Sequence, residues 1–437
     1  MGLARSGVAV ALALRGRGTA VAGCDAGPVA PERRAELEAA GVAVHAGTSG
    51  LELLAAAGTV VKSPGVPAQA PVVASAREAG LAVVGELEIG WRLVPNETIA
   101  VTGSNGKTTT VELIGHLHRT AGQAAEVVGN VGTALSTLAG GALADTTTIV
   151  CEASSFQLED TERFAPDAGV LLNLAEDHLD RHGTFDAYRA AKLEVFARQP
   201  PGTVAVAPEE LAAGGLPGEA ERVWFGTGPT ARLAARDGAL WWDAERLIDC
   251  EGIRLRGPHN VQNAMAAAAV TLARGMAPEV VREGLASFAG VAHRLEAIAT
   301  LDGVLYVNDS KATNVASAVA GLASFAGGVH VILGGRGKGG DYAPLAAAVA
   351  ERGRAAYLIG ETAAEIGAAL ARTGIPLHAA GDLERALAQA RAAARPGEVV
   401  LLSPACASFD QYADYEARGE HFRTLVEGAA AGRRTHA

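Results

Sequence analysis

The sequence is poor in aromatic residues, in charged residues and in cysteine. Aromatic residues fill 4% and charged residues 19% of the 437 positions, whereas 49% are hydrophobic. A composition this apolar excludes an intrinsically disordered chain and is sufficient for several buried cores. The four cysteines are far apart and form no CxxC pair, so the sequence indicates neither a zinc site nor a disulfide framework. A reducing cytoplasm is therefore the expected location.

Basic residues are outnumbered, with 37 lysines and arginines against 48 acidic residues and a net charge of −11. An acidic chain is a poor general binder of nucleic acid or anionic membrane, so an anionic substrate would have to bind in a local pocket. The longest apolar runs, such as 264–273, are shorter than the ~18 residues that span a membrane. No signal peptide is indicated at 8–14, since a basic flank and a cleavage site are missing.

Short apolar segments alternate with helical segments along nearly the whole chain. Segments rich in β-branched residues are predicted strands at 98–101, 147–151, 170–174, 304–307, 329–333, 356–359 and 398–402. Continuous apolar strands are typical of parallel sheets that are buried on both faces, which predicts an α/β fold. We expect three domains, at 1–90, 91–290 and 291–437, with a small β subregion at 203–256.

The chain starts with a glycine turn, GLARSG at 2–7, that is typical of a nucleotide-binding βα unit and leads into a predicted helix at 6–15. Such a turn should follow a strand, and only Met1 precedes it. Either the first strand is absent or the chain start is placed late. We favour the second interpretation, because an open slot in a parallel sheet would leave backbone groups unpaired.

The sharpest motif is the segment 99–110, in which an apolar strand runs into TGSNGKTT and then into a predicted helix at 108–120. Glycines let backbone N–H groups approach phosphate oxygens, and the helix N-terminus adds partial positive charge. Lys107 can neutralise the β- or γ-phosphate, and Thr108 can ligate Mg²⁺. Two residues separate Gly103 from Gly106, instead of the four of the common P-loop. The alternative is a plain turn that caps a helix.

The next two strand ends supply candidate metal ligands. Glu152 follows the apolar strand at 147–151, and a carboxylate there faces the crevice in which α/β sheets bind ligands. His178 lies in the polar segment after the following strand and can bind metal as a neutral imidazole, with a structural or exposed histidine as the alternative. Lys192 by itself has the pattern of a lysine on a helix surface.

Polar clusters follow three strands of the last domain, at 308–314, 333–341 and 402–410. Each could be an ordinary βα turn, but together at one sheet edge they favour a pocket for a small charged substrate. The segment 256–263 opens a helix with Asn260 and Asn263 in its first turn. These two residues suit N-capping as well as recognition of a base or ribose.

Together these motifs resemble the ATP-dependent Mur ligases of peptidoglycan synthesis, and the resemblance covers 2–422. The short P-loop, the His-Asn pair at 259–260 and the His-Arg pair at 293–294 are similar to motifs of the whole family. SSFQL at 154–158, DSKATN at 309–314 and SPACASFDQY at 403–412 are similar to the member that adds D-glutamate. The resemblance implies a Rossmann-like domain for a UDP-sugar, a central P-loop domain for ATP, and a Rossmann-like C-terminal domain for the amino acid.

The resemblance also implies which residues form the site. Lys107, His178 and Lys192 would be catalytic. ATP would bind at Gly103, Ser104, Asn105, Gly106, Lys107, Thr108, Thr109, Asn260, Asn263, Arg294, Asp309 and Lys311. The UDP-sugar would bind at Arg5, Ser6, Ser63, Gly65 and Asn130, and D-glutamate at Thr313, Lys338, Ser408 and Tyr415. Thr108 and Glu152 would hold one Mg²⁺, and His178 and a carbamylated Lys192 would hold a second.

The implied reaction adds D-glutamate to UDP-N-acetylmuramoyl-L-alanine through an acyl phosphate. The expected partners are these small molecules, without nucleic acid or membrane insertion, and a cytoplasmic monomer is expected. The alternatives are another amino-acid ligase of the Mur and folylpolyglutamate type, and a non-catalytic P-loop nucleotide switch. Arg336, in the glycine-rich segment at 334–340, has no assigned role.

Overall fold

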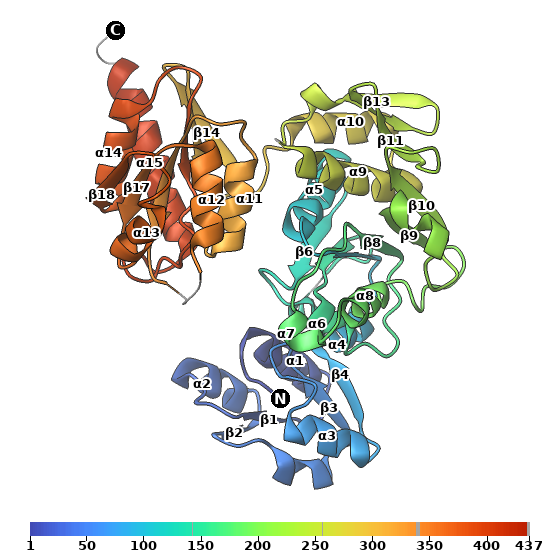
Figure 1. The fold of residues 1–437 in the computed structure, drawn as a ribbon. Coiled ribbons are helices and arrows are strands. Elements are labelled where there is room, and N and C mark those ends of the chain that lie inside the picture. Colours follow the sequence, from blue (N-terminus) through green and yellow to red (C-terminus); the bar gives the residue numbers. More distant parts are fainter. Residues whose placement is uncertain (142, 256, 338–340, 435–437) are drawn as a thin grey trace. The chain divides into compact units, whose positions relative to one another are not determined.

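The structure is a computed structural model that describes residues 1–141, 143–255, 257–337 and 341–434 (Figure 1). The chain divides into two compact units. The first comprises Met1–Arg254 and His259–Phe288, and the second comprises Leu255–Pro258 and Ala289–Ala437. Both units consist of mainly parallel sheets with helices, which confirms the predicted α/β class. The three domain boundaries stay a prediction. None of the helices in the described part of the chain combines the length and hydropathy needed to cross a membrane.

The first unit begins with two separate pairs of parallel strands. β1 (Ala22–Asp25) pairs with β2 (Ala43–Ala46), and β3 (Thr59–Lys62) pairs with β4 (Ala82–Gly85). The accompanying helices are α1 (Arg5–Gly16), α2 (Pro31–Ala39), η1 (Leu51–Ala56), α3 (Pro71–Glu78) and α4 (Glu86–Leu93). Helices α2 and α3 each have a proline in the first turn, where its fixed φ suits a helix and its missing N–H costs nothing.

Met1 and Gly2 lie between these two strand pairs. The Met1 ammonium donates to the Val61 carbonyl at 2.8 Å, and the Met1 carbonyl accepts from the Ser63 N–H at 3.0 Å. On the other side, the Gly2 N–H donates to the Cys24 carbonyl at 2.9 Å. These bonds connect the strand pair β1–β2 to the strand pair β3–β4 through Met1 and Gly2.

The central sheet of the first unit has nine strands in the order β13-β12-β11-β10-β9-β8-β5-β7-β6. The strands are β5 (Thr98–Thr102), β6 (Ala125–Gly129), β7 (Thr148–Glu152), β8 (Ala168–Leu171), β9 (Val204–Pro208), β10 (Glu221–Gly226), β11 (Leu233–Arg236), β12 (Ala239–Trp242) and β13 (Glu245–Asp249). All neighbours are parallel except β11–β12 and β12–β13. The predicted β subregion is confirmed as β9–β13, which extend this sheet.

The remaining helices of the first unit are α5 (Lys107–Thr120), η2 (Leu135–Gly140), α6 (Ser155–Leu158), α7 (Leu179–His182), α8 (Phe185–Leu193), η3 (Glu209–Gly214), η4 (Cys250–Gly252), α9 (Pro258–Ala273) and α10 (Pro278–Ser287). The strand predicted at 170–174 is wrong at its end, since β8 stops at Leu171. Beyond this point the side chain of Asn173 bonds to the backbone of Asn105, so the segment serves the P-loop instead of extending the ladder.

The second unit contains a six-stranded sheet in the order β14-β15-β19-β16-β17-β18. The strands are β14 (Glu296–Leu301), β15 (Val304–Asn308), β16 (Val329–Gly334), β17 (Gly353–Ile359), β18 (Leu377–Gly381) and β19 (Val399–Leu402). The two edge strands, antiparallel β14 and parallel β18, have no counterpart among the predicted strands. The helices are α11 (Val315–Ala323), α12 (Ala343–Arg352), α13 (Ala363–Leu370), α14 (Leu383–Ala393) and α15 (Tyr415–Arg434), seen in orange and red in Figure 1.

Both faces of this second sheet are buried. On β16, Val331 and Leu333 join one core with residues of α11, α12 and α13, whereas Ile332 joins the opposite core with residues of α14 and α15. Successive side chains on a strand point to opposite faces, so a strand covered on both sides is almost entirely apolar. His330 within β16 is buried with Tyr357 and Glu398 as partners, and the predicted site residues lie at the strand ends.

The Glu88 carboxylate on α4 anchors the chain segment at 162–164 in the first unit. Its side chain is fully buried and accepts backbone N–H bonds from Glu162, Arg163 and Phe164 at 2.9–3.1 Å, and it accepts from Arg92 Nε at 2.6 Å. A carboxylate with this many donors is costly to remove, because each buried N–H loses its acceptor.

Glu88→Ala should therefore lower the free energy of unfolding of the first unit by about 3 kcal/mol. Trp91, Trp224, Trp241 and Trp242 are the four tryptophans of the chain and all lie in the first unit, so urea unfolding followed by tryptophan fluorescence reports on that unit. Glu38→Gln is the control, because Glu38 is exposed and its i,i+4 pair with Arg34 contributes only a few tenths of a kcal/mol. Equal urea midpoints for the two variants would contradict this assignment.

Candidate functional site

The P-loop (103–107) connects β5 to α5, as the motif predicts. Gly103 and Gly106 have φ angles of 149° and 87°, which L side chains rarely adopt. A Cβ atom at Gly106 would also collide with Oδ1 of Asn263, so only glycine allows α9 to approach the loop. Because the residue before α5 is a glycine, no side chain caps the first N–H groups of this helix. These groups form a site for an anion such as a phosphate.

The segment after β8 holds the P-loop in place. Asn105 and Asn173 exchange two hydrogen bonds, from Asn105 N–H to Oδ1 at 2.9 Å and from Nδ2 to the Asn105 carbonyl at 3.1 Å. The Ser104 hydroxyl accepts from the Ala175 N–H at 2.9 Å and lies 2.9 Å from the Tyr188 hydroxyl. The sequence analysis missed Asn173 and Tyr188 as site residues. An asparagine inside an otherwise apolar segment was the available signal for Asn173.

The Glu152 carboxylate, at the end of β7, joins two of the predicted site residues. Its Oε2 accepts from the Thr108 hydroxyl at 2.8 Å, and its Oε1 accepts from Asn130 Nδ2 at 3.0 Å. Gly129 has a φ of 118°, and a Cβ atom there would collide with the Glu152 backbone, so the turn that carries Asn130 requires glycine. A hydroxyl and a carboxylate at the start of a P-loop helix are suited to hold Mg²⁺, which takes few protein ligands and completes its shell with phosphates and water.

No group of three or more His, Cys, Asp or Glu side chains arranged for a metal ion occurs within the described residues. A Mg²⁺ that is held by one hydroxyl, one carboxylate and the phosphates of a nucleotide would not require such a group. Thr108 and Glu152 therefore fit the predicted first Mg²⁺ site by their donor chemistry.

Two lysines converge on one backbone carbonyl beside this site. Lys107 Nζ and Lys192 Nζ each donate to the Gly103 oxygen at 2.8 Å. Lys192 is only 2% exposed, and its ammonium lies 4.7 Å from the centroid of the Tyr188 ring. Burial and, to a smaller extent, the nearby Lys107 charge lower the pKa of Lys192 from 10.5 to about 7. The interpretation of Lys192 as a lysine on a helix surface is wrong, because the helix pattern does not show what packs against α8.

His178, a predicted ligand of the second Mg²⁺, is half-exposed. Its side chain is 48% exposed, and the residue adopts a left-handed conformation with φ at 51° just before α7. The imidazole packs 4.8 Å from the Phe156 ring, and it lies 6.5 Å from the Tyr188 ring. Asp177 Oδ2 lies 3.5 Å from Nε2. The ring is therefore accessible to a ligand and lies beside the residues that support the P-loop.

The residues predicted for a UDP-sugar lie around the glycine turn of the chain start. Arg5 Nη1 donates to the Gly132 carbonyl at 2.8 Å, which connects α1 to the turn that carries Asn130. The Ser63 hydroxyl donates to the Gly2 carbonyl at 2.7 Å. Ser6 lies in the first turn of α1, and Gly65 is exposed in the turn after β3. The structure thus brings Arg5 and Asn130 to one turn, and places Ser63 against the glycine turn.

In the second unit, Asp309 and its neighbours follow β15. The Asp309 carboxylate accepts from the Ser403 hydroxyl at 2.7 Å and from the Leu295 N–H at 3.2 Å. Burial raises the pKa of Asp309 to about 7, although these two bonds and the Arg294 charge oppose the change. Asp309 can therefore exchange a proton near neutral pH. It joins Arg294 and the end of β19 at one sheet edge.

Tyr415 and Lys311 lie together at this edge, with the ammonium 5.8 Å from the ring centroid. The Thr313 N–H donates to the Lys311 carbonyl at 2.8 Å. Ser408 is 2% exposed in the segment after β19. Lys338 lies outside the described residues. Arg336, which the sequence leaves without a role, pairs its backbone with Ala407 and its guanidinium with Glu361 at 3.1 Å.

Arg418 on α15 is a buried arginine that the sequence analysis missed. It is 1% exposed and donates to the Ser310 hydroxyl and carbonyl at 2.9 Å and to the Cys406 carbonyl at 3.2 Å. These bonds hold the polar segments after β15 and β19 together. Burial lowers the pKa of Arg418 to about 10, so the guanidinium stays charged at neutral pH. No local pattern distinguishes it from the other arginines of α15.

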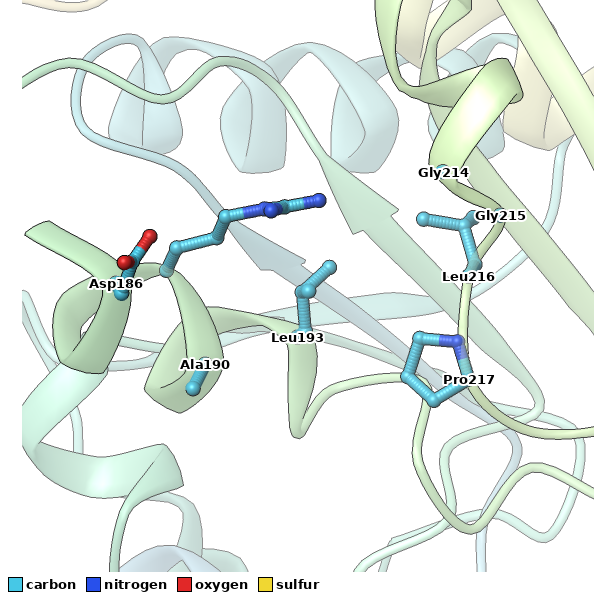
Figure 2. Close-up of a pocket in the computed structure, with 8 residues that line it drawn as sticks. Asp186, Ala190, Leu193, Gly214, Gly215, Leu216 and Pro217 are labelled. Atoms are coloured by element: carbon cyan, nitrogen blue, oxygen red, sulfur yellow. The ribbon is translucent and has the colours of Figure 1, made fainter.

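A cavity of about 530 Å³ lies away from these groups, between α8 and the segment 214–217. Figure 2 shows Asp186, Ala190 and Leu193 on one side of it and Gly214, Leu216 and Pro217 on the other. None of the predicted site residues lines it. Its walls belong to the helix that carries Lys192, and to a segment without predicted chemistry.

Comparison with known proteins agrees with this geometry. The Mur ligase MurD-like N-terminal domain matches residues 1–85, the Mur ligase middle domain matches 101–271, and the Mur ligase glutamate ligase domain matches 293–406. The chain therefore belongs to the Mur ligase family, whose domains are arranged along the sequence in the predicted order.

Within the family, several full-length relatives carry the name UDP-N-acetylmuramoylalanine--D-glutamate ligase. The UDP-N-acetylmuramoylalanine--D-glutamate ligases of Acidobacterium capsulatum and Chromobacterium violaceum are each 41% identical to this chain, over 99% of it and 96% and 98% of their own length. Among solved structures, UDP-N-acetylmuramate-alanine ligase MurC from Thermotoga maritima has a TM-score of 0.59 at 19% identity, covering 97% of this chain and 98% of that one. MurF from the same organism, in complex with ADP, has a TM-score of 0.59 at 17% identity, covering 96% and 99%. These two structures support the fold alone.

The depressed pKa of Lys192 predicts a specific dependence of stability on pH. The unfolded lysine keeps its proton up to about 10.5, whereas the folded one loses it near 7. Between these values the unfolded state binds one more proton, so the free energy of unfolding rises with pH, by up to about 1.4 kcal/mol per pH unit. Below pH 7 both states are protonated and the folded state carries the full cost of the buried charge.

Lys192→Met should remove this contribution. In buffer depleted of CO₂, the free energy of unfolding, measured with urea, should rise between pH 7 and pH 9. This rise should be larger for the wild type than for the variant by about 1–2 kcal/mol. The comparison isolates Lys192, because the other titrating groups are common to both proteins. Identical pH dependences would show that the lysine is not buried as a neutral amine.

Proposed function

We propose that this chain catalyses the ATP-dependent addition of D-glutamate to UDP-N-acetylmuramoyl-L-alanine in peptidoglycan precursor synthesis. The observation that carries the proposal is the convergence of Lys107, Lys192, Thr108 and Glu152 around the P-loop of a chain that is about 40% identical, over nearly its whole length, to ligases of that name. In this reaction the alanine carboxylate attacks the γ-phosphorus of ATP, which releases ADP and leaves an acyl phosphate. The amine of D-glutamate then attacks the acyl carbon, and phosphate leaves.

The P-loop residues act on the first step. The uncapped N–H groups at the start of α5 bind phosphate oxygens, and Lys107 moves from the Gly103 and Ser104 carbonyls to the γ-phosphate. Thr108 and Glu152 would hold one Mg²⁺, which offsets charge on the phosphoryl group. In our proposal Asn260 and Asn263 of α9, with Arg294, Asp309 and Lys311, contact the adenosine.

Lys192 is the residue that requires chemical modification in this scheme. Its neutral Nζ can attack CO₂ and release a proton to solvent, which gives an N-carboxylate. A lysine with a pKa of about 7 has far more neutral amine at physiological pH than an exposed one. The new carboxylate would hold the second Mg²⁺ together with His178, and it would remove the repulsion from Lys107.

The other two substrates define the remaining roles. Arg5, Ser6, Ser63, Gly65 and Asn130 would bind the UDP-sugar. D-Glutamate would bind at Thr313, Lys338, Ser408 and Tyr415. Closure over ATP would protect the acyl phosphate from water. We further propose that the enzyme works as a monomer in the cytoplasm, where ATP and the nucleotide sugar are available.

The proposal predicts that phosphate release depends on one amino acid. With ATP, Mg²⁺ and UDP-N-acetylmuramoyl-L-alanine, D-glutamate should support turnover, whereas L-alanine, L-glutamate and glycine should not. Lys107→Ala should lower kcat by at least about 10³-fold with an unchanged urea midpoint, because it removes a charge that acts on the transferring phosphoryl group.

Two results would contradict this function. Turnover with a different amino acid or with a folate acceptor would assign the chain to another ligase reaction. Nucleotide hydrolysis that is indifferent to every amino acid would favour a P-loop switch instead.

The carbamate proposal has its own test. Lys192→Ala should lose most of its activity, and acetate or formate should restore a part of it, because a small carboxylate can occupy the position of the missing one. Incubation of the wild type with ¹³C-bicarbonate should give a carbamate signal by NMR that the variant lacks. A variant that is fully active without added carboxylate would refute the modification.

A further inference from the structure

The turn at 63–66, which carries the predicted UDP-sugar ligands Ser63 and Gly65, is held by two cations. Arg181 Nη1 donates to the Pro64 carbonyl at 2.6 Å, and Nη2 donates to the Val66 carbonyl at 3.3 Å. Lys62 Nζ donates to the same Val66 carbonyl at 2.8 Å. Three charge-assisted bonds on two backbone oxygens fix the shape of this short turn.

Two carboxylates behind the cations hold them in place. Glu159 accepts from Arg181 Nη2 at 2.7 Å and lies 3.8 Å from Lys62 Nζ, and Asp160 lies 2.6 Å from that nitrogen. The side chains of Lys62 and Asp160 are 0% and 1% exposed. The Arg181 guanidinium also lies over the Phe156 ring, 4.1 Å from its centroid. A guanidinium with partners on three sides has little conformational freedom, so Arg181 can hold the turn at 63–66 in one position.

Arg181 is part of α7, the short helix that begins directly after His178. The Arg181 N–H donates to the His178 carbonyl at 3.1 Å. The next residue, His182, places Nε2 3.0 Å from the Ser155 hydroxyl and Nδ1 3.7 Å from Glu159. The helix is thus fixed to α6 on one side and to the turn at 63–66 on the other. All of these residues belong to the first compact unit.

We propose that Arg181 is a positioning residue that couples the UDP-sugar site to the metal site. It holds the turn at 63–66 against the helix that starts at His178, so that the substrate's carboxylate is presented at a fixed place relative to the second metal. The inference rests on the proposed function, in which Ser63 and Gly65 bind the nucleotide sugar. A carboxylate that must attack phosphorus in line tolerates little displacement, and a shift of about 1 Å can cost about 100-fold in rate.

A purely structural role would have a different signature. An arginine that only joins two parts of the unit would change the urea midpoint, and it would leave the affinities of the three substrates alone. A positioning role instead changes the affinity for the nucleotide sugar selectively. The KM value for ATP stays nearly constant, because the P-loop is bonded to Asn173 and Ala175 and not to Arg181. The KM value for D-glutamate also stays nearly constant, because its proposed ligands belong to the second unit.

The experiment compares Arg181→Ala and Arg181→Lys with Arg189→Ala. Arg189 is an arginine of the adjacent helix α8 that lines the cavity of Figure 2 and has no place in the proposed machinery. Arg181→Ala should weaken direct binding of UDP-N-acetylmuramoyl-L-alanine, measured by calorimetry without ATP, about tenfold, and should raise its KM similarly. Arg181→Lys should show an intermediate loss, since an ammonium cannot reach both carbonyls and Glu159. Arg189→Ala should match the wild type.

A double variant separates action through the turn from a direct contact. If Arg181 acts through the turn, Ser63→Ala and Arg181→Ala together should weaken binding little more than the stronger single variant does. Multiplicative losses, an unchanged dissociation constant for Arg181→Ala, or an equal rise of all three KM values would overturn the inference. Should Arg181→Ala fail to fold, Arg181→Lys supplies the same comparison.

Failure of the proposed function gives a distinct result. The wild type could bind the nucleotide sugar in a way that depends on Arg181 and still release no phosphate with D-glutamate. This result would refute the ligase reaction and support the positioning role of Arg181. A wild type that binds no nucleotide sugar would overturn both.

Discussion

The carbonyl oxygen of Gly103 is the acceptor on which the site depends. Two lysines from distant parts of the sequence, Lys107 and Lys192, donate to it at the same distance of 2.8 Å. Burial, and to a smaller extent the nearby Lys107 charge, lowers the pKa of Lys192 from 10.5 to about 7. A large part of Lys192 is therefore the neutral amine near neutral pH, while Lys107 lies at the P-loop for the phosphate in our proposal. Lys107 and Lys192 have the same type of side chain, and the burial of Lys192 is what separates their proposed roles as cation and nucleophile.

Hydrogen bonds between loops extend this arrangement across the first unit. The P-loop is bonded to the segment at 173–175, Tyr188 of α8 lies within hydrogen-bond distance of Ser104 in the P-loop, and α7 bonds to the turn at 63–66. Most of these bonds are made by backbone groups at the carboxyl ends of parallel strands. Such ends must find partners outside the ladder, and here they find them in one another. The site is therefore built at the carboxyl edge of the sheet, and hydrogen bonds join its loops to one another.

Much of the site was predictable, and the exceptions have physical reasons. The P-loop, Glu152 and the helix start with Asn260 and Asn263 were indicated by local patterns, because strand, glycine turn and helix follow one another in the sequence. The position of Lys192 in the interior was not indicated, since its burial comes from the P-loop about 85 residues earlier. Arg418 was missed for the same reason, because its partners Ser310 and Cys406 lie in the segments after β15 and β19.

The sequence by itself determined the alternation of apolar strands and helices and the residue types at the ends of the predicted strands, because an element buried on both faces is almost entirely apolar within it. It also determined the family, through motifs that are each contiguous. Only the tertiary structure decided the lowered pKa of Lys192, the pairing of Asn173 with the P-loop and the hydrogen bonds from Arg181 to the turn at 63–66. These properties arise between residues that are distant along the chain, and burial and electrostatics depend on what surrounds a group in space.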